Sequence, residues 1–100
     1  MSKNFDDLLS KLKGIQRKKL AVAVAQDEPV LEAVKEANDK GIADAILVGN
    51  KEEISLIAKN IGMDLNKFEI VNIEEPKKAT LHAVELVSIG RADMLMKGLV

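Results

Sequence analysis

Residues 19–34 read KLAVAVAQDEPVLEAV, a continuous apolar run followed by a charged segment of helical spacing. The run Leu20–Ala25 does not alternate between apolar and polar residues, which is typical of a strand buried on both faces of a parallel sheet. The segment Pro29–Lys40 repeats apolar residues at helical intervals, and Pro29 suits the first turn of a helix. Gly41 is a natural stop for that helix. This stretch therefore predicts a buried strand followed directly by an amphipathic helix.

The same alternation continues along the rest of the chain. Three further apolar runs follow, at Asp44–Val48, Phe68–Asn72 and Ala92–Lys97. Amphipathic segments of helical spacing separate them, at Lys51–Ile61 and Pro76–Ile89. Strands that alternate with helices are typical of an α/β domain with a parallel sheet. We therefore predict a Rossmann-like parallel sheet with flanking helices and the strand order 3-2-1-4, which begins a doubly wound sheet.

A further element is expected before the first strand. Apolar residues in Phe5–Lys13 lie on one side of a predicted amphipathic helix. We assign residues 1–18 to this helix and a basic connector, and residues 19–100 to the first part of an N-terminal α/β domain. Because a parallel sheet needs helices on both faces and none follows the last predicted strand, we expect these residues to be the N-terminal part of a longer protein. The alternative is a complete small domain ending in an edge strand.

The composition excludes several classes of binding partner and of chemistry. Lys plus Arg is 15 and Asp plus Glu is 16, so the net charge is −1, and 47% of residues are hydrophobic. The chain has two Phe, no Trp, no Tyr and no Cys, which excludes a base-stacking platform, a disulfide framework and a Cys nucleophile. A basic run precedes the first strand, and we interpret it as a solvated helix end rather than a nucleic-acid patch. The run comprises Lys11, Lys13, Arg17, Lys18 and Lys19.

The apolar segments are short. The longest, Leu20–Ala25, is far below the roughly 20 residues that a membrane helix needs. The first residues contain no apolar signal-peptide core. We therefore expect a cytoplasmic protein with no membrane partner and no nucleic-acid partner.

Candidate ligand-binding residues follow the predicted strands, because open α/β sheets bind ligands beyond the carboxyl ends of their strands. Lys97 and Gly98 follow the fourth strand, where an ammonium group and a nearby backbone N–H suit a phosphate. An exposed strand-end lysine is the alternative. Gln26 and Asp27 follow the first strand and are predicted to line the cleft, although Asp27 also suits a helix cap.

Other chemistry is weakly supported. His82 is the single histidine, and no nucleophile or metal-ligand spacing surrounds it, so we do not predict a catalytic role for it. Neither G-x-G-x-x-G after the first strand nor a P-loop motif occurs. No clustering of His, Asp and Glu has metal-ligand spacing, so no metal site is predicted.

Several strings together resemble the start of the butyryl-transferring members of the phosphate acetyl/butyryl transferase family. They are residues 19–34 quoted above, GIADAILVG at 41–49, AVELVS at 83–88 and ADMLMKGLV at 92–100. The resemblance covers nearly the whole chain from Lys19 onward. The AQDEPVLEA string and the MKGLV string are fairly specific in combination, whereas each alone is weak.

The resemblance implies a much longer enzyme with two α/β domains like those of isocitrate and isopropylmalate dehydrogenases and a site in the cleft between them. Such enzymes convert butyryl-CoA and phosphate to butyryl phosphate and CoA, or use acetyl-CoA, and need no metal or redox cofactor. Lys97 and Gly98 are then expected at the phosphate or acyl phosphate, and Gln26 and Asp27 on the cleft wall. The resemblance also implies a homo-oligomer, and leaves the catalytic residues unassigned and this fragment inactive alone.

Two hypotheses from other functional classes, a signalling module and an assembly module, stay open at this point. A receiver-like signalling module fits Asp27 and Lys97 loosely, but Asn72 stands where its acceptor aspartate is expected. An assembly module without chemistry predicts a folded domain that binds neither CoA nor phosphate.

Overall fold

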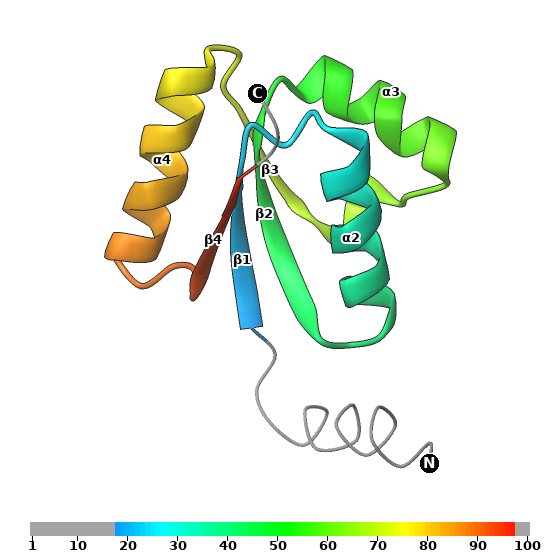
Figure 1. Cartoon of the computed structure of the whole chain (residues 1–100), viewed down its shortest axis with the longest axis horizontal. Coiled ribbons are helices and arrows are strands. Elements are labelled where there is room, and N and C mark those ends of the chain that lie inside the picture. The colour runs from blue at the N-terminus through cyan, green and yellow to red at the C-terminus, as the bar shows by residue number, and fades with distance from the viewer. Residues whose placement is uncertain (1–17, 98–100) are drawn as a thin grey trace.

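The computed structural model describes residues 18–97, so the predicted Phe5–Lys13 helix and Gly98 lie outside the described residues. Four strands alternate with three α-helices along this part of the chain (Figure 1). A short 3-10 helix precedes the third strand. In chain order the elements are β1 (Lys18–Ala23), α2 (Glu28–Asp39), β2 (Ala43–Gly49), α3 (Lys51–Ile61), η1 (Leu65–Lys67), β3 (Glu69–Asn72), α4 (Pro76–Ser88) and β4 (Met94–Lys97).

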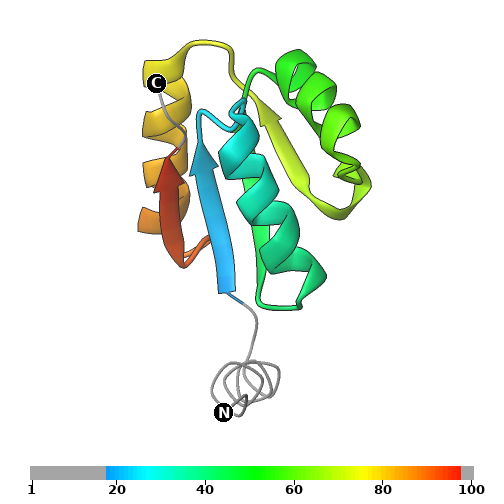
Figure 2. The same cartoon turned by 45° about the vertical axis from the view of Figure 1, so that its right-hand side comes forward.

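The strands form one parallel sheet in the order β3-β2-β1-β4, as predicted. Figure 2 shows the arrows of β4, β1 and β3 pointing the same way, with β4 and β3 at the two margins. The start of β4 is fastened to β1 by a reciprocal pair of hydrogen bonds. The backbone N–H of Lys19 donates to the Asp93 carboxylate at 2.8 Å, and the N–H of Asp93 donates to the Lys19 carbonyl at 2.8 Å.

Helices cover both faces of the sheet, with α4 on one side and α2 and α3 on the other (Figure 1). Successive residues of β1 point to opposite faces, so Ala21 and Ala23 pack toward α4 while Val22 packs toward α2. Both faces are apolar, which explains the continuous apolar run. The α4 side uses small residues, Ala79 and Ala83, which allow the helix to lie close to the sheet.

The face under α2 and α3 carries the larger side chains. Leu31 from α2, Leu47 from β2 and Ile54 from α3 are fully buried there. Burying a side chain of this size stabilises the fold by about 1.5–3 kcal/mol relative to leaving it in water. Within residues 18–97 no helix is long and apolar enough to cross a membrane.

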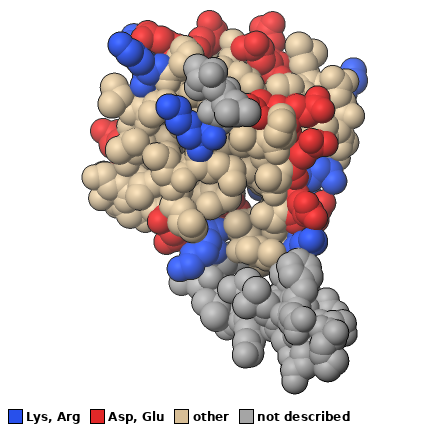
Figure 3. All heavy atoms as spheres, viewed as in Figure 1, with Lys and Arg blue, Asp and Glu red and all other residues tan. Residues whose placement is uncertain are grey.

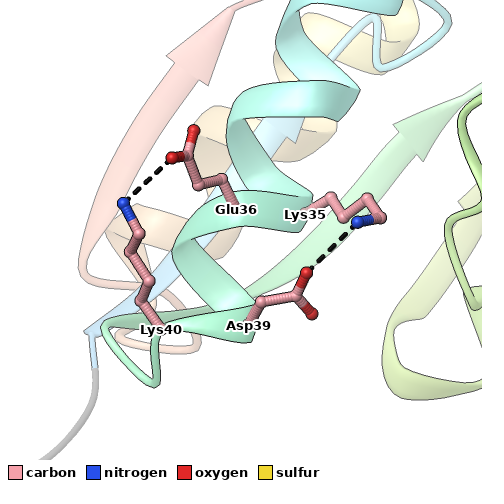
Figure 4. Close-up of polar contacts among 4 residues, drawn as sticks. All are labelled: Lys35, Glu36, Asp39 and Lys40. Carbon is pink, nitrogen blue, oxygen red and sulfur yellow. Dashed lines mark hydrogen bonds and ion pairs between the residues drawn. The ribbon is translucent and has the colours of Figure 1, made fainter.

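Two ion pairs lie on the solvent side of α2 (Figure 4). Lys35 contacts Asp39 at 3.2 Å, and Lys40 contacts Glu36 at 2.9 Å. Each pair joins residues one helical turn apart and stays in contact with solvent, so each contributes only about 0.3–0.5 kcal/mol. These pairs therefore support the helix without deciding how it packs.

The structure corrects the predicted end of the first strand. The apolar run continues to Ala25, but β1 ends at Ala23. Val24 has a φ of 52°, in the left-handed region that a β-branched side chain rarely adopts. The chain turns there, while Val24 and Ala25 stay buried. Hydrophobicity alone cannot distinguish a strand from a buried turn, which is why the predicted strand is too long.

Candidate functional site

The candidate site lies at the carboxyl edge of the sheet, where the strands end and the three α-helices begin (Figure 2). This edge carries the polar side chains that the sequence placed after the strands. Gln26 and Asp27 follow β1, and Asn50 follows β2. Asn72 is the last residue of β3, and Lys97 is the last residue of β4. Parallel strands bring these positions to one edge, as predicted.

Gln26 joins the first two loops of this edge. Its Oε1 accepts a hydrogen bond from the backbone N–H of Asn50 at 3.1 Å. Gly49 makes this approach feasible, because a Cβ there would collide with Gln26 Oε1 and lie 2.9 Å from the Ala25 nitrogen. The amide oxygen of Gln26 is thus engaged in holding the loops together, a role that the sequence analysis did not identify.

Asn72 makes the corresponding link one strand further along. Its Oδ1 accepts from the backbone N–H of Lys51 at 3.1 Å. The N–H of Ile73 donates to the Gly49 carbonyl at 2.9 Å. The end of β3 therefore holds the start of α3, just as Gln26 holds the end of β2. Together these bonds preorganise the carboxyl edge before any ligand arrives.

Asp27 caps α2. Its Oδ1 accepts from the backbone N–H of Val30 at 3.1 Å, and the side chain is partly buried. Asn50 caps α3 in the same way, accepting from the N–H of Glu53 at 3.0 Å. The helix-capping role, one of the two roles that the sequence suggests for Asp27, is therefore present in the structure. Because one carboxylate has several acceptor positions, this bond does not itself prevent contact with a ligand.

Lys97 borders a groove of about 430 Å³ between β4 and the first turns of α4. The other lining residues are Pro76, Lys77, Thr80 and Leu81. Two lysines and a threonine therefore line the same groove as the apolar Pro76 and Leu81. The Thr80 hydroxyl donates to the Pro76 carbonyl at 2.9 Å. Such a lining suits a ligand that combines negative charge with an apolar part.

Sequence reasoning missed Lys77 and Thr80. From the sequence, Pro76–Ile89 is predicted only as a helix packed on the sheet. The signal was nevertheless available: α4 begins directly after β3, so a parallel topology places its first turn at the edge where β4 ends. Gln26 and Asp27 do not line this groove, although Lys97 is in register with Ala23 near the end of β1. The structure thus places these candidates on one edge but in separate parts of it.

A second groove, of about 310 Å³, lies at the start of α3. Both acidic and basic side chains line it, so its charge is mixed. Its lining residues are Asn50, Lys51, Glu52, Ser55, Asn72 and Glu74. This mixture is less suited to an anion than the groove beside Lys97.

His82 lies on α4, and its Nδ1 is 3.9 Å from Glu85 Oε1. The neighbour is a carboxylate one turn along the same helix, so this contact does not pair the imidazole with a nucleophile. Within residues 18–97 no group of three or more His, Asp or Glu side chains is arranged to hold a metal ion.

Comparison with known proteins adds independent information. A family model described as Phosphate acetyl/butaryl transferase matches residues 4–80. Phosphate butyryltransferases from Clostridium beijerinckii and Clostridium acetobutylicum are 68% and 64% identical to this chain over its whole length. A phosphate acetyltransferase from Thermotoga maritima is 41% identical over 81% of the chain and 27% of its own length. The chain spans only 33% of the length of each of the two clostridial relatives.

The fold also matches a solved structure. The EutD phosphotransacetylase from Staphylococcus aureus superposes with a TM-score of 0.72 over 93% of this chain and 37% of that one. The two sequences are 21% identical, so this match establishes the fold alone. It agrees with the predicted parallel α/β architecture.

Proposed function

The chain belongs to the phosphate acetyl/butyryl transferase family, and we propose that it is the N-terminal part of an enzyme that transfers a butyryl group from CoA to inorganic phosphate. The identity with two phosphate butyryltransferases over the whole chain carries this proposal. In this proposal, residues 19–100 form the first part of an N-terminal α/β domain, and a second domain completes the cleft.

The proposed reaction places heavy demands on positioning. A phosphate oxygen attacks the thioester carbonyl, a C–O bond forms, the C–S bond breaks, and CoA leaves as the thiolate. Phosphate is a weak nucleophile toward a thioester, so holding it in line with the carbonyl is a large part of catalysis. Donors that face the developing oxyanion supply further stabilisation. The butyryl-CoA thioester is a substrate in this scheme, and the scheme includes no cofactor.

The groove beside Lys97 supports a phosphate-binding role for this edge. Lys97 and Lys77 are among the residues that line it, and the ammonium group of a flexible lysine can approach a dianion while it keeps contact with water. We propose that Lys97, together with the backbone of Gly98, binds phosphate or the phosphate end of the acyl phosphate. Gln26 and Asp27 are proposed to form the adjoining cleft wall, with Gln26 acting through the position of Asn50.

Acetyl transfer is the second candidate, because a phosphate acetyltransferase also matches most of the chain. The pocket that holds the acyl chain decides between the two substrates. Butyryl and acetyl groups differ by two methylene groups, and each methylene group in such a pocket contributes about 1–3 kcal/mol to discrimination in kcat/KM. Family membership disfavours the receiver-like and assembly readings. A cytoplasmic location is part of the proposal, since CoA thioesters are intracellular metabolites. A homo-oligomer is also part of it, on the family resemblance alone.

The test is release of CoA thiol from butyryl-CoA by a full-length enzyme that contains this chain, with and without phosphate. We expect release that depends on phosphate and a higher kcat/KM for butyryl-CoA than for acetyl-CoA. A preference for acetyl-CoA would replace the butyryl proposal by the acetyl one. A folded full-length protein that releases no thiol from either substrate would contradict both.

A further inference from the structure

The hydroxyl of Thr80 has its hydrogen committed within α4. Thr80 is half-buried and lines the groove beside Lys97. Its Oγ1 donates to the Pro76 carbonyl at 2.9 Å, one helical turn earlier. A hydroxyl has one hydrogen and two lone pairs. Because the hydrogen is used within the helix, Thr80 can offer a ligand in the groove only the lone pairs of its oxygen, so it acts there as a hydrogen-bond acceptor.

The other polar side chains among the described lining residues are donors. Lys77 and Lys97 each carry an ammonium group, which has three hydrogens and no acceptor. Within residues 18–97 neither of them makes an ion pair, whereas the neighbouring Lys78 contacts Glu75 at 3.8 Å. Figure 3 shows acidic side chains gathered over α2, on the right of the view, with few over α4 and β4. The described lining thus combines two cations with one acceptor, the Thr80 oxygen.

Phosphate and sulfate differ in the one property that this lining can detect. Both are tetrahedral dianions of similar size near neutral pH, but hydrogenphosphate carries one P–O–H group and sulfate carries no hydrogen. Two lysines attract both ions alike, because a lysine ammonium acts on an anion as a point charge. An acceptor distinguishes them, since a P–O–H group donates to it, whereas a sulfate oxygen approaches it without a hydrogen bond.

We propose that Thr80 is a specificity-determining residue whose Oγ1 accepts the P–O–H hydrogen of hydrogenphosphate and so selects phosphate over sulfate. This inference rests on the proposed function, because it takes the groove beside Lys97 as the site of inorganic phosphate. The lysines then set the affinity of the groove for dianions, and Thr80 sets the choice between them. Without the Thr80 oxygen, the groove contains only groups that treat the two ions alike.

The same hydrogen bond selects the oxygen that reacts. The hydrogen stays on the phosphate oxygen that Thr80 holds, and a deprotonated oxygen of the same ion attacks the thioester carbonyl. A C–O bond forms, the C–S bond breaks, and the electron pair of the C–S bond leaves with CoA as the thiolate. The acyl phosphate keeps the P–O–H hydrogen and one negative charge, and the thiolate carries the other.

The test compares phosphate with sulfate in a full-length enzyme that contains this chain. Thr80→Val removes the oxygen and keeps a side chain of similar shape. We measure the KM for phosphate and the inhibition constant for sulfate as a competitor, at constant ionic strength so that screening is equal. We expect the variant to raise the KM for phosphate about fivefold or more, as for the loss of one hydrogen bond, without weakening the binding of sulfate. Thr80→Ser keeps the hydroxyl and should retain the selectivity of the unmodified enzyme.

Two further variants control for indirect effects. Thr80→Ala removes the same oxygen and replaces Thr80→Val if that variant does not fold. Lys77→Gln removes a charge from the same groove, and we expect it to weaken phosphate and sulfate by the same factor. A general disturbance of α4 would likewise weaken both ions equally. The proposal is overturned if removal of the Thr80 oxygen leaves the ratio of the two constants unchanged, or if Lys77→Gln changes that ratio as much.

The outcome for Thr80 is distinguishable from the outcome for the proposed function. An enzyme that releases thiol in the presence of phosphate, but whose selectivity does not change in Thr80→Val, contradicts the role of Thr80 alone. A folded enzyme that releases no thiol from either acyl-CoA contradicts both. The ratio of the two constants therefore tests Thr80 separately from the overall reaction.

Discussion

At the scale of single residues, the carboxyl edge depends on a close contact between Gly49 and Gln26. The Gln26 side chain lies where a Cβ on Gly49 would be, and its Oε1 accepts from the Asn50 N–H. The contact joins two loops that are 24 residues apart in sequence. A side chain at position 49 must therefore displace the link itself.

Gly49→Ala is expected to destabilise the fold by about 1–3 kcal/mol, because overpacking forces the Gln26 side chain and nearby backbone to move. Gln26→Ala is expected to cost about 1 kcal/mol, since the Asn50 N–H loses its partner. The double variant should lose less than the sum of the two, because the collision with Gln26 is gone. Urea unfolding of the three variants measures this, and strictly additive losses would contradict the contact.

Val24 is a second residue whose role is local. Its φ of 52° puts a β-branched side chain in the left-handed region, at a cost that glycine does not incur. Val24 and Val22 are both buried, so they form a matched pair. We expect Val24→Gly to lose about 1 kcal/mol less stability than Val22→Gly, because it also relieves the backbone. Equal losses in thermal unfolding would argue against the turn at this residue.

At the scale of elements, the helices differ in how they begin. Asp27 caps α2 and Asn50 caps α3 through side-chain oxygens, whereas Glu75 makes no such bond at the start of α4. The uncapped helix is the one that borders the groove beside Lys97. Capping therefore supports the two helices on one face, while the start of α4 is left without a side-chain cap.

Asn50→Ala is expected to destabilise the domain by about 1 kcal/mol through loss of the α3 cap. Ser55→Ala is the control, because Ser55 lies within α3, is exposed and takes no part in the cap. We expect its effect to lie within about 0.5 kcal/mol of zero. If chemical denaturation shows the two variants to be equally stable, the cap does not stabilise α3.

Sequence alone predicts the order and type of these elements well. Continuous apolar runs such as Asp44–Val48 and helical spacing in Lys51–Ile61 are local signals, and the topology of parallel sheets supplies the rest. The predicted end of β1 was wrong because a hydrophobic residue such as Val24 gives no sign that the backbone turns there. The Gln26–Asn50 bond and the contribution of Lys77 and Thr80 to the groove were missed because they depend on tertiary placement.

At the scale of the whole molecule, two edges of the described domain differ in polarity. The carboxyl edge is preorganised by hydrogen bonds and carries the lysines of the groove. The margin at β4 beside it carries exposed apolar side chains, Met94 and Leu95. The two edges meet at Lys97, so the proposed phosphate site lies where the polar edge adjoins the apolar margin.

The most direct test of this account is the KM for phosphate of the full-length enzyme with Lys97→Ala. We predict a KM raised about tenfold or more, as expected for losing one charged contact. Lys67→Ala is the control, since Lys67 is exposed in η1 before β3, away from the groove, and we expect its KM to match the unmodified enzyme. A Lys97→Ala enzyme with an unchanged KM for phosphate would contradict the assignment of the groove to the substrate.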